Sequence, residues 1–281
     1  MLVILLLSCV KNIHKMAILK DLWLRGCGLP YVMVTGNAHL SQDYLHFPKT
    51  KRLVVRTEDD YDHLCDKMLK ALKAIKQIYP DVTGVFKIDD DVFLSLPRFQ
   101  EWIQDYYKNT HQTIDYAGIR CKRMDYWSYY HYGKCSSPRM NNIPMYVSRV
   151  VYAQGPFYFM SRKSVDILLK NMKPHEHLYE DYLIGKTLNA HGIVFVDAHF
   201  YTESLQRFVL GNDRVIAFHD LEHVYNFQEV ERRYSINRAS LEKYYDDKHN
   251  QFFILIKVVM SLVIICIALR FFFILRPSLQ A

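Results

Sequence analysis

Three consecutive acidic residues stand in the segment KIDDDVFL at residues 87–94. An apolar run precedes them, and we expect a turn where they stand. A buried strand there would present the carboxylates at the carboxyl edge of a sheet, where α/β proteins bind ligands. Asp89 and Asp91 stand two residues apart and can converge on one hard divalent cation, which in turn can bridge to a diphosphate. A solvated turn, with the aspartates as turn formers, is the alternative interpretation.

Two further acids stand where a helical pattern begins, in YEDYLIG at residues 179–185. The helix dipole would stabilise Glu180 and Asp181 at that end, which is a purely structural interpretation. The functional interpretation is a general base, because an ionised carboxylate can accept the proton of a sugar hydroxyl as that hydroxyl attacks. Taken alone, the segment leaves both interpretations open.

A histidine, His219, follows an apolar, strand-like run in VIAFHDLEH at residues 215–223. A lone histidine is usually structural. In a chain that already offers an acidic cluster, an imidazole nitrogen can complete the coordination of a divalent cation. The sequence has no C-x-x-C pair and no other His/Cys ligand spacing, so we do not expect a structural zinc site.

The elements that must position these side chains alternate along the first half of the chain. Apolar runs predict strands at residues 2–9, 31–35, 52–55 and 83–88. Apolar residues at helical spacing predict helices at residues 12–25 and 60–78. This alternation predicts an α/β fold with a mostly parallel sheet flanked by helices.

The second half of the chain has a less regular pattern. It predicts helices at 97–107, at 162–172 with Ser161 as the cap, and at 181–190, and extended segments at 116–120, 153–161 and 192–196. Residues 122–150 are polar and aromatic and are left unassigned. Within them, DYWSYYHY at 125–132 has two interpretations, a partly buried, tyrosine-rich hairpin, which we favour, and a lining of the acceptor site, since sugars stack on aromatic faces.

Composition excludes several classes of protein. Half of the 281 residues are hydrophobic, which excludes intrinsic disorder, and six cysteines are too few for a disulfide-dense scaffold. Cys121 and Cys135 would close a loop if they were oxidised. The net charge of +7 suits an anionic substrate. It would also suit nucleic acid, but the basic residues form no dense cluster outside the flank of the segment described next, so we expect no nucleic-acid partner.

One segment is long and apolar enough to span a membrane. Residues 252–275 contain only two charges, Lys257 and Arg270, both near the ends of the segment. We therefore expect a folded body at residues 1–250 and a single-pass, C-terminal transmembrane anchor. The basic flank before the segment places the body in the cytosol by the positive-inside rule. The shorter apolar run at residues 2–7 is interpreted as a buried strand and not as a signal peptide.

Together these residues resemble the beta-1,3-galactosyltransferase and Fringe-like glycosyltransferases (glycosyltransferase family 31), which have a GT-A fold. The resemblance runs from about residue 2 to residue 223. Its blocks are LLLSCVKN with DLWLRG, EDDYDHLCDKMLKAL (matching at Asp59, Tyr61, Leu64 and Lys67), KIDDDVFL, YAQGPFYFMS (at Tyr152, Gly155, Tyr158 and Ser161) and YEDYLIG (at Glu180, Asp181 and Gly185). Five blocks in the right order are more specific than any one of them.

The resemblance implies inverting transfer of a hexose or N-acetylhexosamine, most simply galactose or N-acetylglucosamine, from a UDP-sugar to a glycan hydroxyl, in a beta-1,3 linkage. The cofactor would be Mn²⁺ or Mg²⁺, held by Asp91, His219 and Asp89, and the general base would be Asp181. The contacts to the donor nucleotide would come from Ser8, Lys87, Asp89 and Asp90.

The chain also departs from the family pattern. Arg56 stands where the family has Asp, His63 where it has Asn, Pro156 where it has a small residue, and Tyr182 where it has Val. These changes leave the sugar undetermined and motivate an alternative, a catalytically inactive sugar-nucleotide-binding scaffold at a membrane. Family members mostly carry an N-terminal anchor and work in the Golgi lumen, so an ER or Golgi lumenal body is the alternative to the cytosolic one.

Overall fold

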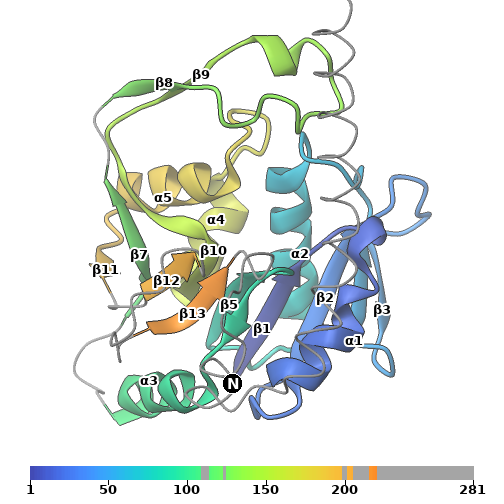
Figure 1. Ribbon diagram of the computed structural model, residues 1–281, viewed down its shortest axis with the longest axis vertical. Helices are drawn as coiled ribbons and strands as arrows, with labels where there is room; N and C mark the ends of the chain where they lie inside the picture. The colour runs from blue at the N-terminus through green and yellow to red at the C-terminus, as the bar shows by residue number, and fades with distance from the viewer. Residues whose placement is uncertain (109–113, 123–124, 198–200, 205–214, 220–281) are drawn as a thin grey trace, which may run out of the picture.

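A computed structural model describes residues 1–108, 114–122, 125–197, 201–204 and 215–219. Its centre is an eight-stranded sheet with the order β11-β7-β10-β5-β1-β2-β4-β3 (Figure 1). The strands β1 (Leu2–Leu7), β2 (Tyr31–Gly36), β4 (Arg52–Val55) and β5 (Gly84–Asp89) pair in parallel, as the sequence predicts. All six side chains of β1 are buried, because both faces of the parallel sheet are covered.

Helices cover the sheet on both faces, and the alternation of β1 side chains divides the core accordingly (Figure 1). Leu2, Ile4 and Leu6 pack with the helices α1 (Lys15–Leu19) and α3 (Leu96–Lys108) and with the π-helical turn η2 (Lys20–Leu24) that continues α1. Val3, Leu5 and Leu7 pack with α2 (Leu64–Ile78), α4 (Arg162–Asn171) and α5 (Glu180–Ala190). The fold is therefore a mixed α/β layer structure.

The sheet becomes mixed in its second half. The long strand β10 (Val151–Ser161) runs antiparallel between β5 and β7 (Tyr116–Lys122), and β11 (Phe195–Asp197) pairs in parallel with β7. A short edge strand, β3 (Tyr44–Phe47), was not predicted and pairs antiparallel with β4. The predicted helix cap is confirmed, since the Ser161 hydroxyl accepts the backbone N–H of Ser164.

The unassigned aromatic region forms a hairpin, as the favoured interpretation predicts, but several of its aromatic side chains are exposed and not buried. Its strands β8 (Tyr126–Ser128) and β9 (Met145–Val147) pair antiparallel, with the short helical turn η3 (Met140–Asn142) between them. A further helical turn, η1 (Val10–Asn12), follows β1. A small separate sheet joins β12 (Tyr201–Ser204), β13 (Val215–His219) and β6 (Phe93–Leu94), the strand that follows the acidic turn.

The predicted membrane anchor at residues 252–275 lies outside the described residues, as does the boundary near residue 250. Within the described part of the chain, no helix has the length and hydropathy needed to cross a bilayer. Cys121 and Cys135 are buried, free thiols in the same hydrophobic cluster, so the loop between them is not closed by a disulfide.

Candidate active site

The acidic turn lies at the carboxyl edge of the parallel strands, as predicted. Asp89 is the last residue of β5 and pairs in register with Leu7, the last residue of β1. Strands β1 and β5 therefore end side by side. The residues that follow them are in contact, because the Ser8 hydroxyl donates to Asp90 Oδ2 over 2.6 Å. Ser8 and Asp90, two of the residues expected to contact the donor nucleotide, are thus hydrogen-bonded to each other.

Asp90 fixes the chain that follows β1. Besides Ser8, the Asn12 amide donates to its Oδ2 over 2.9 Å, and the Lys15 ammonium lies 2.9 Å from its Oδ1. Asp90 and Lys15 are both buried, and this set of donors compensates the cost of burying the carboxylate. In this structure Asp90 holds the segment from Ser8 to Lys15 against the acidic turn, and a direct contact of Asp90 with a nucleotide stays a prediction.

Lys87 lies at the centre of a second network. Its ammonium is 2.6 Å from Asp89 Oδ1, 2.5 Å from the carbonyl oxygen of Gly155 and 3.8 Å from Glu180 Oε2. Burial opposes the charge of Lys87, but the neighbouring carboxylates outweigh it and hold the pKa of Lys87 above its ordinary value. Lys87 thereby joins β5, β10 and α5, and its own contact with uridine or phosphate stays a prediction.

Glu180 and Asp181 stand at the start of α5, where Glu180 faces Lys87. The Tyr158 hydroxyl donates to Glu180 Oε1, and burial raises the pKa of Glu180. Asp181 is half-buried and accepts the backbone N–H of Tyr182 over 2.7 Å. Burial raises the pKa of Asp181 too, with a smaller contribution from the charge of Asp89.

Gly155 connects the two halves of this cluster. A Cβ atom at this position would lie 3.5 Å from Asp181 Oδ2, while the Gly155 carbonyl accepts from Lys87. Asp89, Lys87, Glu180 and Asp181 therefore form one continuous polar cluster across β5, β10 and α5. Burial also raises the pKa of Asp89, although Lys87 opposes that rise. A raised carboxylate pKa is typical of a group that accepts a proton in catalysis.

The backbone also brings His219 toward the acidic turn. Strand β13 pairs antiparallel with β6, with Phe218 opposite Phe93, so His219 lies one position further toward Asp91. The side chain of His219 is outside the described residues. Within the described residues, no group of three or more His, Cys, Asp or Glu side chains converges as a complete metal site. The carboxylate oxygens of Asp89 and Asp91 are nevertheless the donors that a hard cation requires.

Sequence reasoning missed the side chains that hold this edge together. Asp59 accepts the backbone N–H groups of Val10 (2.5 Å) and Gly36 (2.7 Å) and pairs with Lys67. Lys67 also donates to the carbonyl of Ser8 over 3.2 Å. The available signal was a lysine in the apolar stripe of a helix, because such a buried cation needs a partner.

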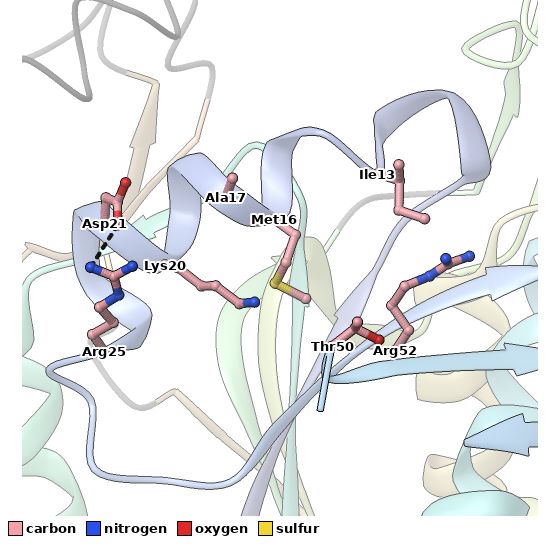
Figure 2. Close-up of a pocket in the computed structure, with 8 residues that line it drawn as sticks. All are labelled: Ile13, Met16, Ala17, Lys20, Asp21, Arg25, Thr50 and Arg52. Atoms are coloured by element: carbon pink, nitrogen blue, oxygen red, sulfur yellow. Dashed lines mark ion pairs between the residues drawn. The ribbon is translucent and has the colours of Figure 1, made fainter. Parts of the chain in front are cut away.

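A groove elsewhere on the molecule is lined by apolar and mostly basic side chains, unlike the carboxylate cluster (Figure 2). It has a volume of about 400 Å³ and lies between the α1–η2 helix and the start of β4. Ile13, Met16 and Ala17 supply an apolar wall, and Lys20, Arg25 and Arg52 supply basic groups, of which Arg25 pairs with Asp21 over 3.0 Å. The groove shares no residue with the carboxylate cluster.

A comparison of the whole chain with protein families shows which family carries this cluster. The family model described as galactosyltransferase matches residues 52–199, more than half of the chain. The chain belongs to the galactosyltransferase family. The matched residues run from β4 to just beyond β11 and include Lys87, Asp89 and Asp181, whereas Ser8 and His219 lie outside them. Membership supports glycosyl transfer from a sugar donor to a glycan acceptor as the class of activity.

The other comparisons add little for the galactosyltransferase domain. A solved structure of a glycosyltransferase involved in the glycosylation of the major capsid of PBCV-1 is 11% identical, with a TM-score of 0.46. The match covers 87% of this chain and 98% of that chain. Among curated proteins, no match is found.

Proposed function

We propose that this protein is an inverting, metal-dependent hexosyltransferase. It moves a hexose or N-acetylhexosamine, galactose or N-acetylglucosamine, from a UDP-sugar to a glycan hydroxyl in a beta-1,3 linkage. One observation carries the proposal. Lys87 contacts both Asp89 of the acidic turn and the carbonyl of Gly155, and Gly155 lies against Asp181. These contacts link Asp89, the proposed donor-side carboxylate, to Asp181, the proposed base, and support this assignment of roles.

The chemistry assigned to Asp181 is proton acceptance. The acceptor oxygen attacks the anomeric carbon opposite the leaving UDP, the bond from that carbon to the diphosphate breaks, and the hydroxyl proton passes to Asp181. Burial raises the pKa of Asp181, which makes it a stronger base than an exposed aspartate. Gly155 lies against this carboxylate and its carbonyl accepts from Lys87, and neither residue exchanges protons in this scheme.

Asp89, Asp91 and His219 would hold Mn²⁺ or Mg²⁺, which when bound supplies positive charge that stabilises the diphosphate leaving group. Asp89 and Asp91 are oxygen donors on one short turn, and the register of β13 on β6 brings the backbone of His219 to the same place. Ser8 and Asp90 would shape the adjoining nucleotide pocket, because their hydrogen bond holds the segment after β1 against that turn.

Donor hydrolysis tests the proposal. The full-length chain, purified in detergent, is incubated with a panel of UDP-sugars and a mixed glycan acceptor, with Mn²⁺ or with chelator, and free UDP is measured. We expect metal-dependent UDP release from one donor. Asp181→Asn should abolish it, and Asp105→Asn, at an exposed acid on α3, is the matched control. Equal activity in chelator would refute the metal assignment. Metal-dependent UDP binding without turnover of any donor would favour the inactive scaffold.

We propose that the protein is held at a membrane by the segment at residues 252–275, with its body in the cytosol. The support is the length of this segment and its basic flank in the sequence. Protease treatment of intact microsomes tests the orientation, since a cytosolic body is digested. A protected body would place it in the ER or Golgi lumen instead.

A further inference from the structure

Large apolar side chains that remain exposed are concentrated between β7 and β10. All of them in this region are at least 36% exposed, namely Trp127, Tyr129, Tyr130, Tyr132, Ile143 and Tyr146. Such a group, in which Trp127 contacts Tyr146 and Tyr129 contacts Tyr132, indicates a binding surface, because single exposed apolar residues are common but contiguous groups are not. In Figure 1 the β8–β9 hairpin that carries them lies above α5, the helix that begins with Glu180 and Asp181.

The inner side of the hairpin is fixed to the start of α5. The hydroxyl of Tyr179 donates to Ser128 Oγ over 2.8 Å, and His131 Nδ1 lies 2.8 Å from the same hydroxyl. Tyr179 directly precedes Glu180 in the chain. On the opposite edge, the backbone N–H of Ser136 donates to Asp62 over 2.7 Å. The hairpin therefore has a fixed place between the start of α2 and the start of α5.

One aromatic side chain of the hairpin contacts Tyr179, at the start of α5. Tyr130 is 70% exposed, and its ring meets that of Tyr179 edge-on, with 6.3 Å between centroids. The Lys134 ammonium lies 3.2 Å from the Tyr130 ring centroid and 5.8 Å from that of Tyr61. Burial raises the pKa of Tyr61, with smaller contributions from Tyr130 and Asp181. Tyr130, Lys134 and Tyr61 thus lie together beside Tyr179, the residue that directly precedes Glu180 and Asp181 at the start of α5.

We propose that Tyr130, Lys134 and Tyr61 form the acceptor subsite, where a sugar ring of the acceptor glycan stacks on Tyr130 and presents its hydroxyl to Asp181. The inference rests on the proposed function and deepens it. Lys134 covers one face of the Tyr130 ring, and the high exposure of Tyr130 leaves the rest of the ring open to a ligand. The apolar face of a sugar ring packs on such an aromatic surface, while the nearby ammonium can donate hydrogen bonds to its hydroxyl oxygens.

Kinetics with varied acceptor test the subsite. The full chain and three variants, Tyr130→Ala, Tyr130→Phe and Phe47→Ala, are compared for acceptor KM, donor KM and UDP release without acceptor. Phe47 is an exposed aromatic residue on β3, at the opposite edge of the sheet, and serves as the matched control. We expect Tyr130→Ala to raise acceptor KM about tenfold or more, which corresponds to about 1.4 kcal/mol of binding. Donor KM and acceptor-free UDP release should stay at wild-type values, and Tyr130→Phe should keep a near-normal acceptor KM.

An unchanged acceptor KM in Tyr130→Ala would overturn the subsite while leaving the proposed transfer intact. If no donor is turned over at all, the proposed function fails, and binding to a glycan array then tests the subsite by itself. Glycan binding by the wild-type chain that is lost in Tyr130→Ala and kept in Phe47→Ala would support a carbohydrate surface. Equal binding by all variants, or no glycan binding by the wild-type chain, would refute it. Thermal unfolding of each variant checks that the fold is retained.

Discussion

Asp59 and Lys67 form an ion pair, with 2.6 Å between Oδ1 and Nζ, beside the carboxyl ends of β1 and β2. Lys67 is almost fully buried, and each member of the pair also bonds to the backbone of the segment after β1. The two residues are the charged ones among the four positions at which the block at residues 58–72 matches the family pattern. Their spacing in that block therefore has a structural reason, which is to fix the chain that carries Ser8.

Lys67→Met should destabilise the protein strongly. The change leaves Asp59 partly buried without its cation and removes the donor to the Ser8 carbonyl, and breaking a buried pair in this way costs about 3–5 kcal/mol. Urea unfolding measures the loss. Lys70→Met, which removes a more exposed pair with Asp66 on the same helix, is the control and should cost about 1 kcal/mol or less. Equal effects of the two changes would contradict this account.

Asp181→Asn and Glu180→Gln should differ in activity, because only Asp181 is the proposed base. Loss of a general base lowers the rate about 10²–10⁴-fold, so Asp181→Asn should remove transfer. Its stability should be unchanged or higher, because burial raises the pKa of Asp181 and the neutral amide avoids that cost. Glu180→Gln keeps an acceptor for the Tyr158 hydroxyl and should keep most of the activity. Rates and unfolding midpoints of both variants provide the check, and an active Asp181→Asn protein would reassign the base.

Gly185→Ala should damage both stability and activity, although alanine is the better helix former. A Cβ at Gly185 would lie 2.2 Å from Tyr152 Cβ and 2.8 Å from Tyr152 Cα, so α5 would have to move away from β10. Overpacking of this kind costs about 1–3 kcal/mol, against a gain of about 1 kcal/mol in helix propensity. The displaced helix would also shift Asp181. Asn189→Ala, at an exposed position of α5, should be neutral in the same thermal-unfolding and transfer assays.

The stability of the protein should fall between pH 6.5 and pH 4 in part because of His177. Burial lowers the pKa of His177 to about 4, and its Nδ1 accepts the backbone N–H of Tyr179. In the unfolded chain this imidazole binds a proton below about pH 6.5, whereas in the folded chain it does so only near pH 4. Acidification between these values therefore favours unfolding. The loss in the free energy of unfolding from this group is at most on the order of 3 kcal/mol. His177→Gln should flatten this part of the pH–stability curve. His39→Gln, at an exposed position, should leave the curve unchanged.

Much of the parallel core follows from the sequence. The unbroken apolar run of β1 indicates a strand buried on both faces, and the apolar stripe of α2 indicates a helix packed on that sheet. The acids that follow β5 are necessarily at its carboxyl end. These features are local, because each depends on residues adjacent in the chain or separated by one or two helical turns.

The arrangement of the site depends on contacts that are distant in the sequence. The antiparallel insertion of β10 between β5 and β7 brings the Gly155 carbonyl to Lys87, 68 residues away, and α5 then sets Asp181 against Gly155. An alternating or apolar run has the same appearance in a parallel or an antiparallel strand, so the sequence does not contain this pairing in readable form. Which carboxylate each buried lysine meets, Asp90 for Lys15, Asp59 for Lys67 and Asp89 for Lys87, was likewise decided only when the whole sheet assembled.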